Sequence, residues 1–83
     1  MPDWRFVYVL KSERRPDRYY TGLTSNVTAR LADHNDGRCA STAGNRPWRI
    51  DLIVEFADSA RAVKFERYLK SGSGCAFANR HLR

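Results

Sequence analysis

The chain has 83 residues, a length that suits one small domain and no more. Apolar residues make up 42% and aromatic residues 12%, a composition typical of a globular protein and not of a disordered one. No apolar run approaches the length of a membrane-spanning helix, and the amino terminus has no signal-peptide pattern. We therefore predict one globular domain over residues 1–83 with no membrane segment, and the two lone cysteines, Cys39 and Cys75, favour a cytoplasmic location.

The charge balance indicates a polyanionic partner. Fifteen Lys and Arg residues against nine Asp and Glu give a net charge of +6, and a basic balance of this size is typical of proteins that bind nucleic acid. Solubility alone is the other explanation for such a surface. Cys39 and Cys75 each stand alone and the two histidines lie far apart, so we expect free thiols and no zinc site.

The first part of the chain predicts a β-hairpin. Alternation over residues 4–11 indicates a strand. Four of its side chains share one face: Trp4, Phe6, Tyr8 and Leu10. A charged turn that contains Pro16-Asp17 leads to a second strand over residues 18–23, which is rich in β-forming residues and broken by Gly22. A short connection favours antiparallel pairing of the two strands.

A helix is predicted over residues 26–36. Thr24, Ser25 and Asn26 each offer an N-cap, and Gly37 suits the end of the helix. Four residues at i, i+3, i+4 and i+7 spacing form one stripe: Val27, Arg30, Leu31 and His34. Two polar side chains therefore occupy positions where a core-facing helix prefers apolar ones, a mismatch that is typical of functional sites.

Residues 37–48 are predicted to form an irregular connection that contains one short helical turn. Residues 49–56 alternate cleanly and predict a third strand, which we expect to be the main core strand. Its apolar face is formed by Ile50, Leu52, Val54 and Phe56. The sheet is thus expected to have three strands.

A second long helix is predicted from a cap at Asp58 to about Lys70. Its inward stripe consists of Ala62, Phe65, Glu66 and Leu69. Basic residues are expected to wind around its opposite side: Arg61, Lys64, Arg67 and Lys70. The segment 71–74, SGSG, is expected to end this helix, and residues 75–83 to form a short terminal helix.

Several of these residues follow a known order. Two short strand motifs are present, Phe6-Val7-Tyr8 and Tyr20-Thr21-Gly22. Eleven residues separate the tyrosine of the first motif, Tyr8, from that of the second, Tyr20. Polar residues follow on the predicted helices: Arg30, His34, Glu66 and Asn79. With this order and spacing the chain resembles the GIY-YIG nuclease superfamily, named after its two strand motifs, over essentially its whole length.

Longer phrases refine the resemblance. YTGLTSNVTARLADHN and RYLKSGSGCAF look like the small stand-alone members, the YhbQ-like group. The order of HNDG, Thr42 and Pro47-Trp48 is similar to the nuclease domain of Slx1-type structure-selective endonucleases. Two positions depart from the pattern. The first triplet lacks its glycine, and Leu23 stands where some members, including the excision-repair nuclease subunit UvrC, carry a lysine that helps to activate a tyrosine.

The resemblance implies an α/β fold in which a small three-stranded antiparallel sheet is flanked by helices, in the order β-β-α-(α)-β-α-α. It also implies an endonuclease that hydrolyses DNA phosphodiester bonds with one Mg²⁺ or Mn²⁺ ion and the help of a tyrosine, in DNA repair or recombination. Tyr8 is then the expected general base and Tyr20 its support, although the two could exchange roles.

The chemistry of these residue types agrees with such a reaction. A phenol, with a pKa near 10, is a weak base at neutral pH, and a nearby cation or metal lowers that pKa. The guanidinium of Arg30 suits a phosphate because it stays charged and donates two parallel hydrogen bonds. A lone carboxylate, Glu66, suits a Mg²⁺ that takes another ligand from the substrate. His34 is expected to orient the attacking water or to contact phosphate.

Each of these residues also has a structural alternative. Half-buried tyrosines are usually packing residues. Arg30 could pair with an acid such as Asp33 or Glu66 in a structural ion pair. A lone histidine such as His34 is often a satisfied polar residue, and Glu66 could simply be solvated. The segment 71–74 could bind phosphate as a backbone nest, although a plain helix end is the more common outcome.

Nucleic-acid contacts are expected from the basic residues of the second long helix and from the last helix: Arg61, Lys64, Arg67, Lys70 and Asn79. The alternative to an endonuclease is a catalytically silent module that binds nucleic acid or joins a repair complex. We expect weak sequence preference, with selectivity supplied by DNA structure or by a partner protein. Damaged, branched and single-stranded DNA, and RNA, all stay open as substrates.

Overall fold

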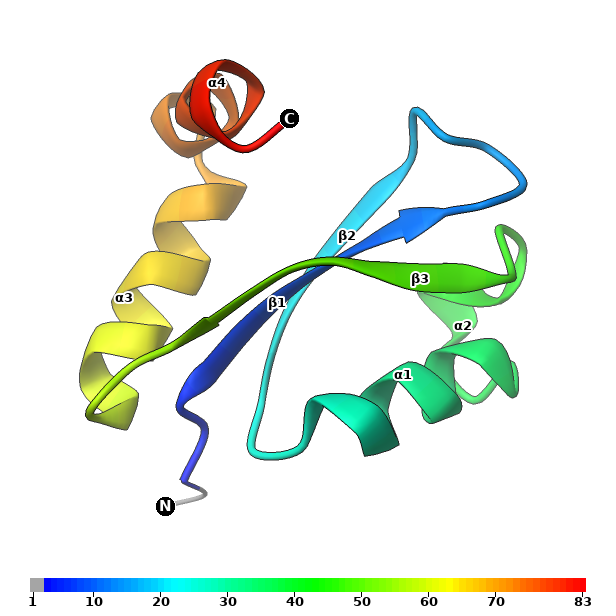
Figure 1. Cartoon of the computed structure of the whole chain (residues 1–83), viewed down its shortest axis with the longest axis horizontal. Coiled ribbons are helices and arrows are strands. Elements are labelled where there is room, and N and C mark those ends of the chain that lie inside the picture. Colours follow the sequence, from blue (N-terminus) through cyan, green and yellow to red (C-terminus); the bar gives the residue numbers. More distant parts are fainter. Residues whose placement is uncertain (1–2) are drawn as a thin grey trace.

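A three-stranded antiparallel sheet forms the centre of the protein (Figure 1). The structure, a computed structural model, describes residues 3–83. Its strands are β1 (Phe6–Ser12), β2 (Tyr19–Thr24) and β3 (Trp48–Glu55), in the order β2-β1-β3. Its helices are α1 (Val27–Asn35), α2 (Ala40–Ala43), α3 (Ser59–Lys70) and α4 (Gly72–His81). The predicted α/β fold and element order are confirmed.

The central strand is β1, which pairs with both of the others. Four consecutive residues of it are buried: Val7, Tyr8, Val9 and Leu10. The expectation that the third strand would be the main core strand is wrong, because β3 lies at an edge of the sheet. Ile50 and Ile53 on β3 remain 38% and 44% exposed. A regular alternation thus marked a strand correctly without revealing its place in the sheet.

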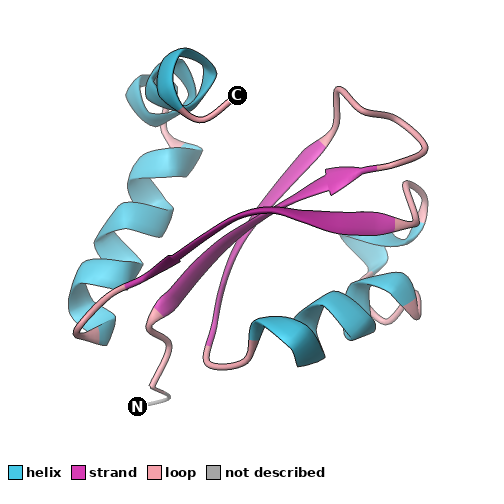
Figure 2. Ribbon diagram, in the orientation of Figure 1, coloured by secondary structure: helices cyan, strands magenta, loops and turns pink. Residues whose placement is uncertain are grey.

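Helices cover both faces of the sheet (Figure 2). Their side chains make two separate cores with those of the strands. Val7 and Val9 face α3 and α4, where they pack with Ala62, Leu69 and Ala78. Tyr8 and Leu10 face the other side, where they pack with Trp48 and with residues of β2 and α1. The first core is apolar, whereas the second also buries His34 and Thr42. Buried polar side chains of the two cores therefore lie on the face covered by α1 and α2.

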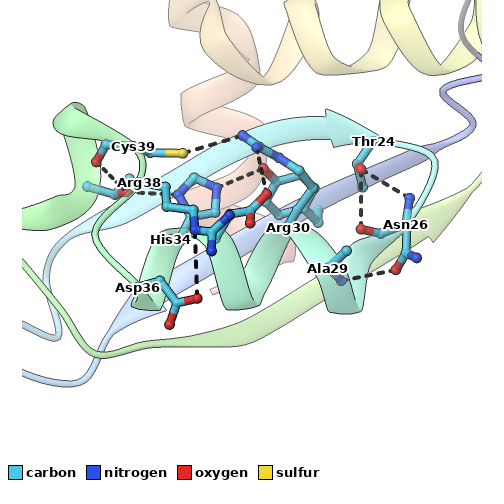
Figure 3. A network of polar contacts seen from close by, with 11 residues as sticks. Thr24, Asn26, Ala29, Arg30, His34, Asp36, Arg38 and Cys39 are labelled. Carbon is cyan, nitrogen blue, oxygen red and sulfur yellow. Dashed lines mark hydrogen bonds and ion pairs between the residues drawn. The ribbon is translucent and has the colours of Figure 1, made fainter.

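The predicted helix ends are confirmed in detail. The Asn26 side chain accepts a hydrogen bond from the N–H of Ala29 at 3.0 Å and caps α1, and the hydroxyl of Thr24 accepts one from the Asn26 N–H (Figure 3). Asp58 caps α3 by accepting from the N–H of Arg61 at 2.8 Å. Gly37 follows α1 with a φ of +77°, a conformation that favours glycine. Within residues 3–83, no helix combines the length and apolarity needed to cross a membrane.

The junction between α3 and α4 differs from its prediction. Ser71 ends α3 and also caps α4, since its hydroxyl accepts a hydrogen bond from the N–H of Gly74 at 3.1 Å. The last helix therefore begins at Gly72, three residues before the predicted start, and segment 71–74 forms a helix cap with the first turn of α4. Gly74 is buried there, and a Cβ built on it would lie 1.6 Å from the carbonyl oxygen of Tyr68.

Gly74→Ala is expected to destabilise the protein by about 1–3 kcal/mol or more, because the new methyl group meets fixed backbone of α3. Gly72→Ala is the matched control. A Cβ there meets no atom within 4 Å, and alanine favours a helix over glycine by about 0.5–1 kcal/mol. Urea denaturation of both variants measures the difference. Equal free energies of unfolding would contradict the close α3–α4 contact.

Candidate active site

One cleft of about 440 Å³ lies where the β2 edge of the sheet meets α1 and α3. Its lining includes the four residues that the sequence analysis placed at the centre of the chemistry: Tyr8, Tyr20, Arg30 and Glu66. They come from β1, β2, α1 and α3. The lining carries three cations and one carboxylate, namely Arg30, Arg67, Lys70 and Glu66. The structure therefore brings these side chains together in a basic cleft.

Tyr8 lies directly across the strand pair from Gly22. A Cβ built on Gly22 would lie 2.5 Å from the Tyr8 hydroxyl oxygen and ring carbon. The glycine of the second strand motif therefore has a direct steric reason, because any side chain there would displace the Tyr8 ring. The same neighbourhood holds Tyr20, whose ring centre is 6.2 Å from that of Tyr8.

His34 is fully buried behind Tyr8, so the expected contact with water or phosphate is not made by its own ring. Its Nε2 lies 2.9 Å from the Tyr8 hydroxyl, and its Nδ1 lies 2.8 Å from Oγ1 of Thr42. The Thr42 hydroxyl donates to the carbonyl of Cys39 and is left to accept from the imidazole. This order makes Nδ1 the protonated nitrogen and leaves Nε2 to accept from Tyr8.

Burial and charge set the protonation states of this group. Burial, and next the nearby Arg30, lower the pKa of His34 below its usual 6.5. Burial also raises the pKa of Tyr8 above 10, and the interaction with Arg30 offsets only part of that rise. The same interaction with Tyr8 raises the pKa of Arg30. A neutral imidazole, a neutral phenol and a charged guanidinium are therefore the state of the free site at neutral pH.

Arg30 extends from α1 beside His34, and its guanidinium points toward Cys39 (Figure 3). It lies 3.4 Å from a carboxylate oxygen of Asp33 and 3.6 Å from the Cys39 sulfur. The predicted structural ion pair with Asp33 thus exists. However, the side chain keeps 36% of its surface exposed and lines the cleft, so it is also free to meet a ligand.

Glu66 enters the cleft from α3 with 14% of its side chain exposed, and its Oε2 lies 2.6 Å from Nζ of Lys70. The expectation that the basic residues of α3 all lie on the side of the helix opposite Glu66 is therefore wrong for Arg67 and Lys70. Lys70 follows Glu66 by four residues and shares its face, and Arg67 also lines the cleft. Arg61, which pairs with Asp58, and Lys64 are exposed outside the lining.

The site fits one divalent cation but no larger metal centre. Within residues 3–83, no group of three or more His, Cys, Asp and Glu side chains could enclose a metal ion. Glu66 is the one carboxylate in the lining of the cleft, and Mg²⁺ is commonly held by one or two carboxylates together with substrate phosphate and water. Lys70, with 54% of its side chain exposed, would have to yield its place on Glu66.

A further predicted site residue, Asn79, lies outside the cleft, and two residues of the site, Thr42 and Trp4, were not predicted to belong to it. Asn79 is on the exposed side of α4 and accepts a hydrogen bond from Arg83, outside the cleft. Thr42 was noted only as part of a motif, yet it fixes the His34 ring. Trp4 is predicted to lie within the first strand, on the same face as Tyr8, but it precedes β1, is 43% exposed and lines the cleft. No periodicity distinguishes such an aromatic residue from a core one.

Comparison with known proteins agrees with this geometry. Residues 5–75 match the GIY-YIG catalytic domain. The chain belongs to the GIY-YIG family. The motif tyrosines Tyr8 and Tyr20, Arg30 and Glu66 all lie within that match. Cys39 and Cys75 are free thiols, as expected.

Relatives fall into two groups. The chain is 37% identical over 73 residues to a structure-specific endonuclease subunit SLX1 of Scheffersomyces stipitis and covers 22% of that protein's length. A second such subunit, from Debaryomyces hansenii, is 34% identical and is covered to 25%. A UPF0213 protein of Listeria welshimeri is 39% identical over 66 residues, with 71% of its length covered. The chain thus spans about a quarter of the fungal proteins and most of the bacterial one.

The buried His34 predicts a loss of stability in acid. Its folded pKa is lower than its unfolded value of about 6.5, so the stability contributed by the neutral ring is complete above that pH. This contribution is lost as the pH falls through the folded pKa. His34→Gln, which keeps a neutral donor and acceptor, is therefore expected to lose less stability than the parent between about pH 7.5 and 5.5. Urea denaturation at both pH values measures the change, and equal losses would contradict the buried neutral ring.

Proposed function

We propose that this chain is a metal-dependent endonuclease domain that hydrolyses DNA phosphodiester bonds. The observation that carries the proposal is the convergence of two tyrosines, an arginine and a carboxylate from four different elements in one basic cleft. Such a set supplies what phosphodiester hydrolysis needs: a route for the proton of water, a phosphate ligand and a cation ligand. Membership in the GIY-YIG family supports the same reaction.

Tyr8 is the proposed general base, and His34 is its proton acceptor. The attacking water gives a proton to the Tyr8 oxygen while the Tyr8 proton passes to Nε2 of His34. The water oxygen forms the new bond to phosphorus, the bond to the leaving sugar oxygen breaks, and solvent protonates that oxygen. Without His34, a phenol whose pKa is raised by burial would be a poor base. Some members of the family carry a lysine at the position of Leu23 that helps to activate a tyrosine. In this chain His34, on α1, is proposed to give that help to Tyr8.

Arg30 is the proposed phosphate ligand. Its guanidinium is always charged and donates in a fork that matches phosphate oxygens. A phosphate bound there also brings negative charge close to His34, whose pKa Arg30 lowers in the free site. Substrate binding therefore favours the imidazolium that the proton transfer creates. Tyr20, which lines the cleft beside Tyr8, is the proposed hydrogen-bond partner of the attacking water or the phosphate.

Glu66 is the proposed ligand for one Mg²⁺ or Mn²⁺ ion. When bound, such an ion supplies positive charge that neutralises the phosphate and the leaving oxygen. Glu66 reaches the cleft from α3, on the other side of the sheet from α1. Glu66 contributes a carboxylate that is only 14% exposed and that lines the same cleft as Arg30.

The cell's substrate is proposed from the relatives and from the charge of the cleft. The fungal proteins are described as structure-specific endonuclease subunits, which supports recognition of DNA shape, assisted by a partner protein, in repair or recombination. Arg67 and Lys70 at the cleft are the proposed phosphate contacts along the strand, and Arg61 and Lys64 continue the basic surface of α3. A cytoplasmic location remains part of the proposal.

Nicking of supercoiled plasmid in the presence of Mg²⁺ or Mn²⁺ tests this function. We expect the parent to nick, and Arg30→Ala and Glu66→Gln each to lose about 100-fold or more, since removal of one group that stabilises the transition state costs about that factor. Arg80→Gln is the charge-matched control, because it removes one exposed cation on α4, away from the cleft. All variants are first checked for an unchanged unfolding midpoint.

A silent binding module would behave differently. It would bind DNA with an affinity that falls steeply with salt, and Glu66→Gln would bind at least as well as the parent. If the parent binds but cuts no plasmid, branched, single-stranded or RNA substrate with either ion, the enzyme is ruled out and the binding module stands.

A further inference from the structure

Trp4 has an unusual place for a tryptophan. Its indole is 43% exposed, although burying such a ring would be favourable. The other tryptophan, Trp48, is only 4% exposed and donates its ring N–H to the carbonyl of Thr42. Trp4 is not on a loose end, because the next residue, Arg5, accepts a backbone hydrogen bond from Phe56 at 2.8 Å. The chain thus holds an exposed aromatic ring beside the cleft.

Apolar as well as charged side chains line the cleft. Trp4 lines it together with Leu23 of β2 and Val63 of α3, while Arg30 and Glu66 line it from α1 and α3. A phosphate suits the charged residues but gains nothing from the apolar ones. A nucleobase attached to that phosphate has a flat apolar face, which suits the indole of Trp4.

The same geometry selects an unpaired base. In a duplex the faces of a base are covered by its neighbours, so an aromatic side chain can stack on it only after the base leaves the helix. The volume of the cleft, about 440 Å³, lies in the range of sites for single small ligands. It is therefore matched to one extruded or single-stranded nucleotide.

We propose that Trp4 stacks on an unpaired nucleobase next to the scissile phosphate and makes the site selective for nucleic acid with an unpaired nucleotide there. This inference rests on the proposed nuclease function and names its substrate class. The substrate would be a single strand, a flap or a junction, where such nucleotides exist without the cost of unpairing. Trp4 is then a specificity residue and takes no part in proton transfer.

A second hollow supports the path of the strand. It has a volume of about 450 Å³ and shares Tyr20 and Lys70 with the cleft. Arg18 and Arg83 add two further cations to it and Asp17 adds one carboxylate, so that cations outnumber anions three to one. A strand that leaves the cleft past Tyr20 would therefore meet cations along its backbone, whereas the Trp4 side offers a surface for a base.

Fluorescence and affinity together test the stacking. Binding is measured in the presence of a chelator, so that no cleavage occurs, with a labelled single-stranded oligonucleotide and the same sequence as a blunt duplex. We expect Trp4→Leu to weaken single-strand binding about 5- to 100-fold, the usual effect of losing one stacked base. Trp4→Phe, which keeps an aromatic face, is expected to retain most of the affinity. Duplex binding should change less than twofold in both variants.

Tryptophan emission gives a readout that does not depend on activity. Because Trp48 is buried, quenching by the single strand is expected to come from Trp4 and to vanish in Trp4→Phe. Tyr68→Leu, which removes another exposed aromatic residue outside the cleft, is expected to bind like the parent. The stacking proposal is overturned if Trp4→Leu weakens single-strand and duplex binding equally or not at all, even where the parent nicks DNA. A parent that shows the quenching but never cuts would instead refute the nuclease function alone.

Discussion

The buried hydrogen bond between the Tyr8 hydroxyl and Nε2 of His34 is the interaction on which the site depends. It joins β1 to α1 across 26 residues of sequence at 2.9 Å, and the bond from Nδ1 to Thr42 joins the same ring to α2. A buried polar group left without a partner costs about 1–3 kcal/mol, so each of these groups holds the others in place. The bond that fixes Tyr8 also gives its proton a destination.

The small size of the sheet explains how two faces serve one site. With only three strands, the edge strand β2 lies next to the central strand β1, so a residue of β1 is still close to the edge. Helix α1 approaches that edge from one face and brings Arg30, whereas α3 approaches from the other face and brings the carboxylate of Glu66. The face covered by α3 and α4 is packed with apolar side chains, which leaves the polar chemistry to the other face and the edge.

The sequence predicted the helices and strands better than it predicted the contacts of their side chains. The caps at Asn26 and Asp58 and the stripe that contains Arg30 and His34 are local patterns, and all of them are found. The order of the strands in the sheet depends on distant parts of the chain. The alternation of β3 therefore favours a core strand although β3 lies at the edge. The hydrogen-bond partners of His34 could not be predicted, because Tyr8 lies on a strand and Thr42 lies in another helix. Alternation places Trp4 on the same face as Tyr8 but does not say what covers that face, so the exposure of Trp4 could not be predicted.

The protonation state of His34 is the most direct test of this arrangement. Long-range nitrogen–proton NMR correlations on uniformly labelled protein at neutral pH distinguish the two imidazole nitrogens. We expect a neutral ring with the proton on Nδ1 and an unprotonated Nε2 that accepts from Tyr8. In Tyr8→Phe, the Nε2 resonance should shift toward that of a nitrogen without a hydrogen bond. A proton on Nε2 of the parent, or an imidazolium at neutral pH, would contradict the proposed route of the proton.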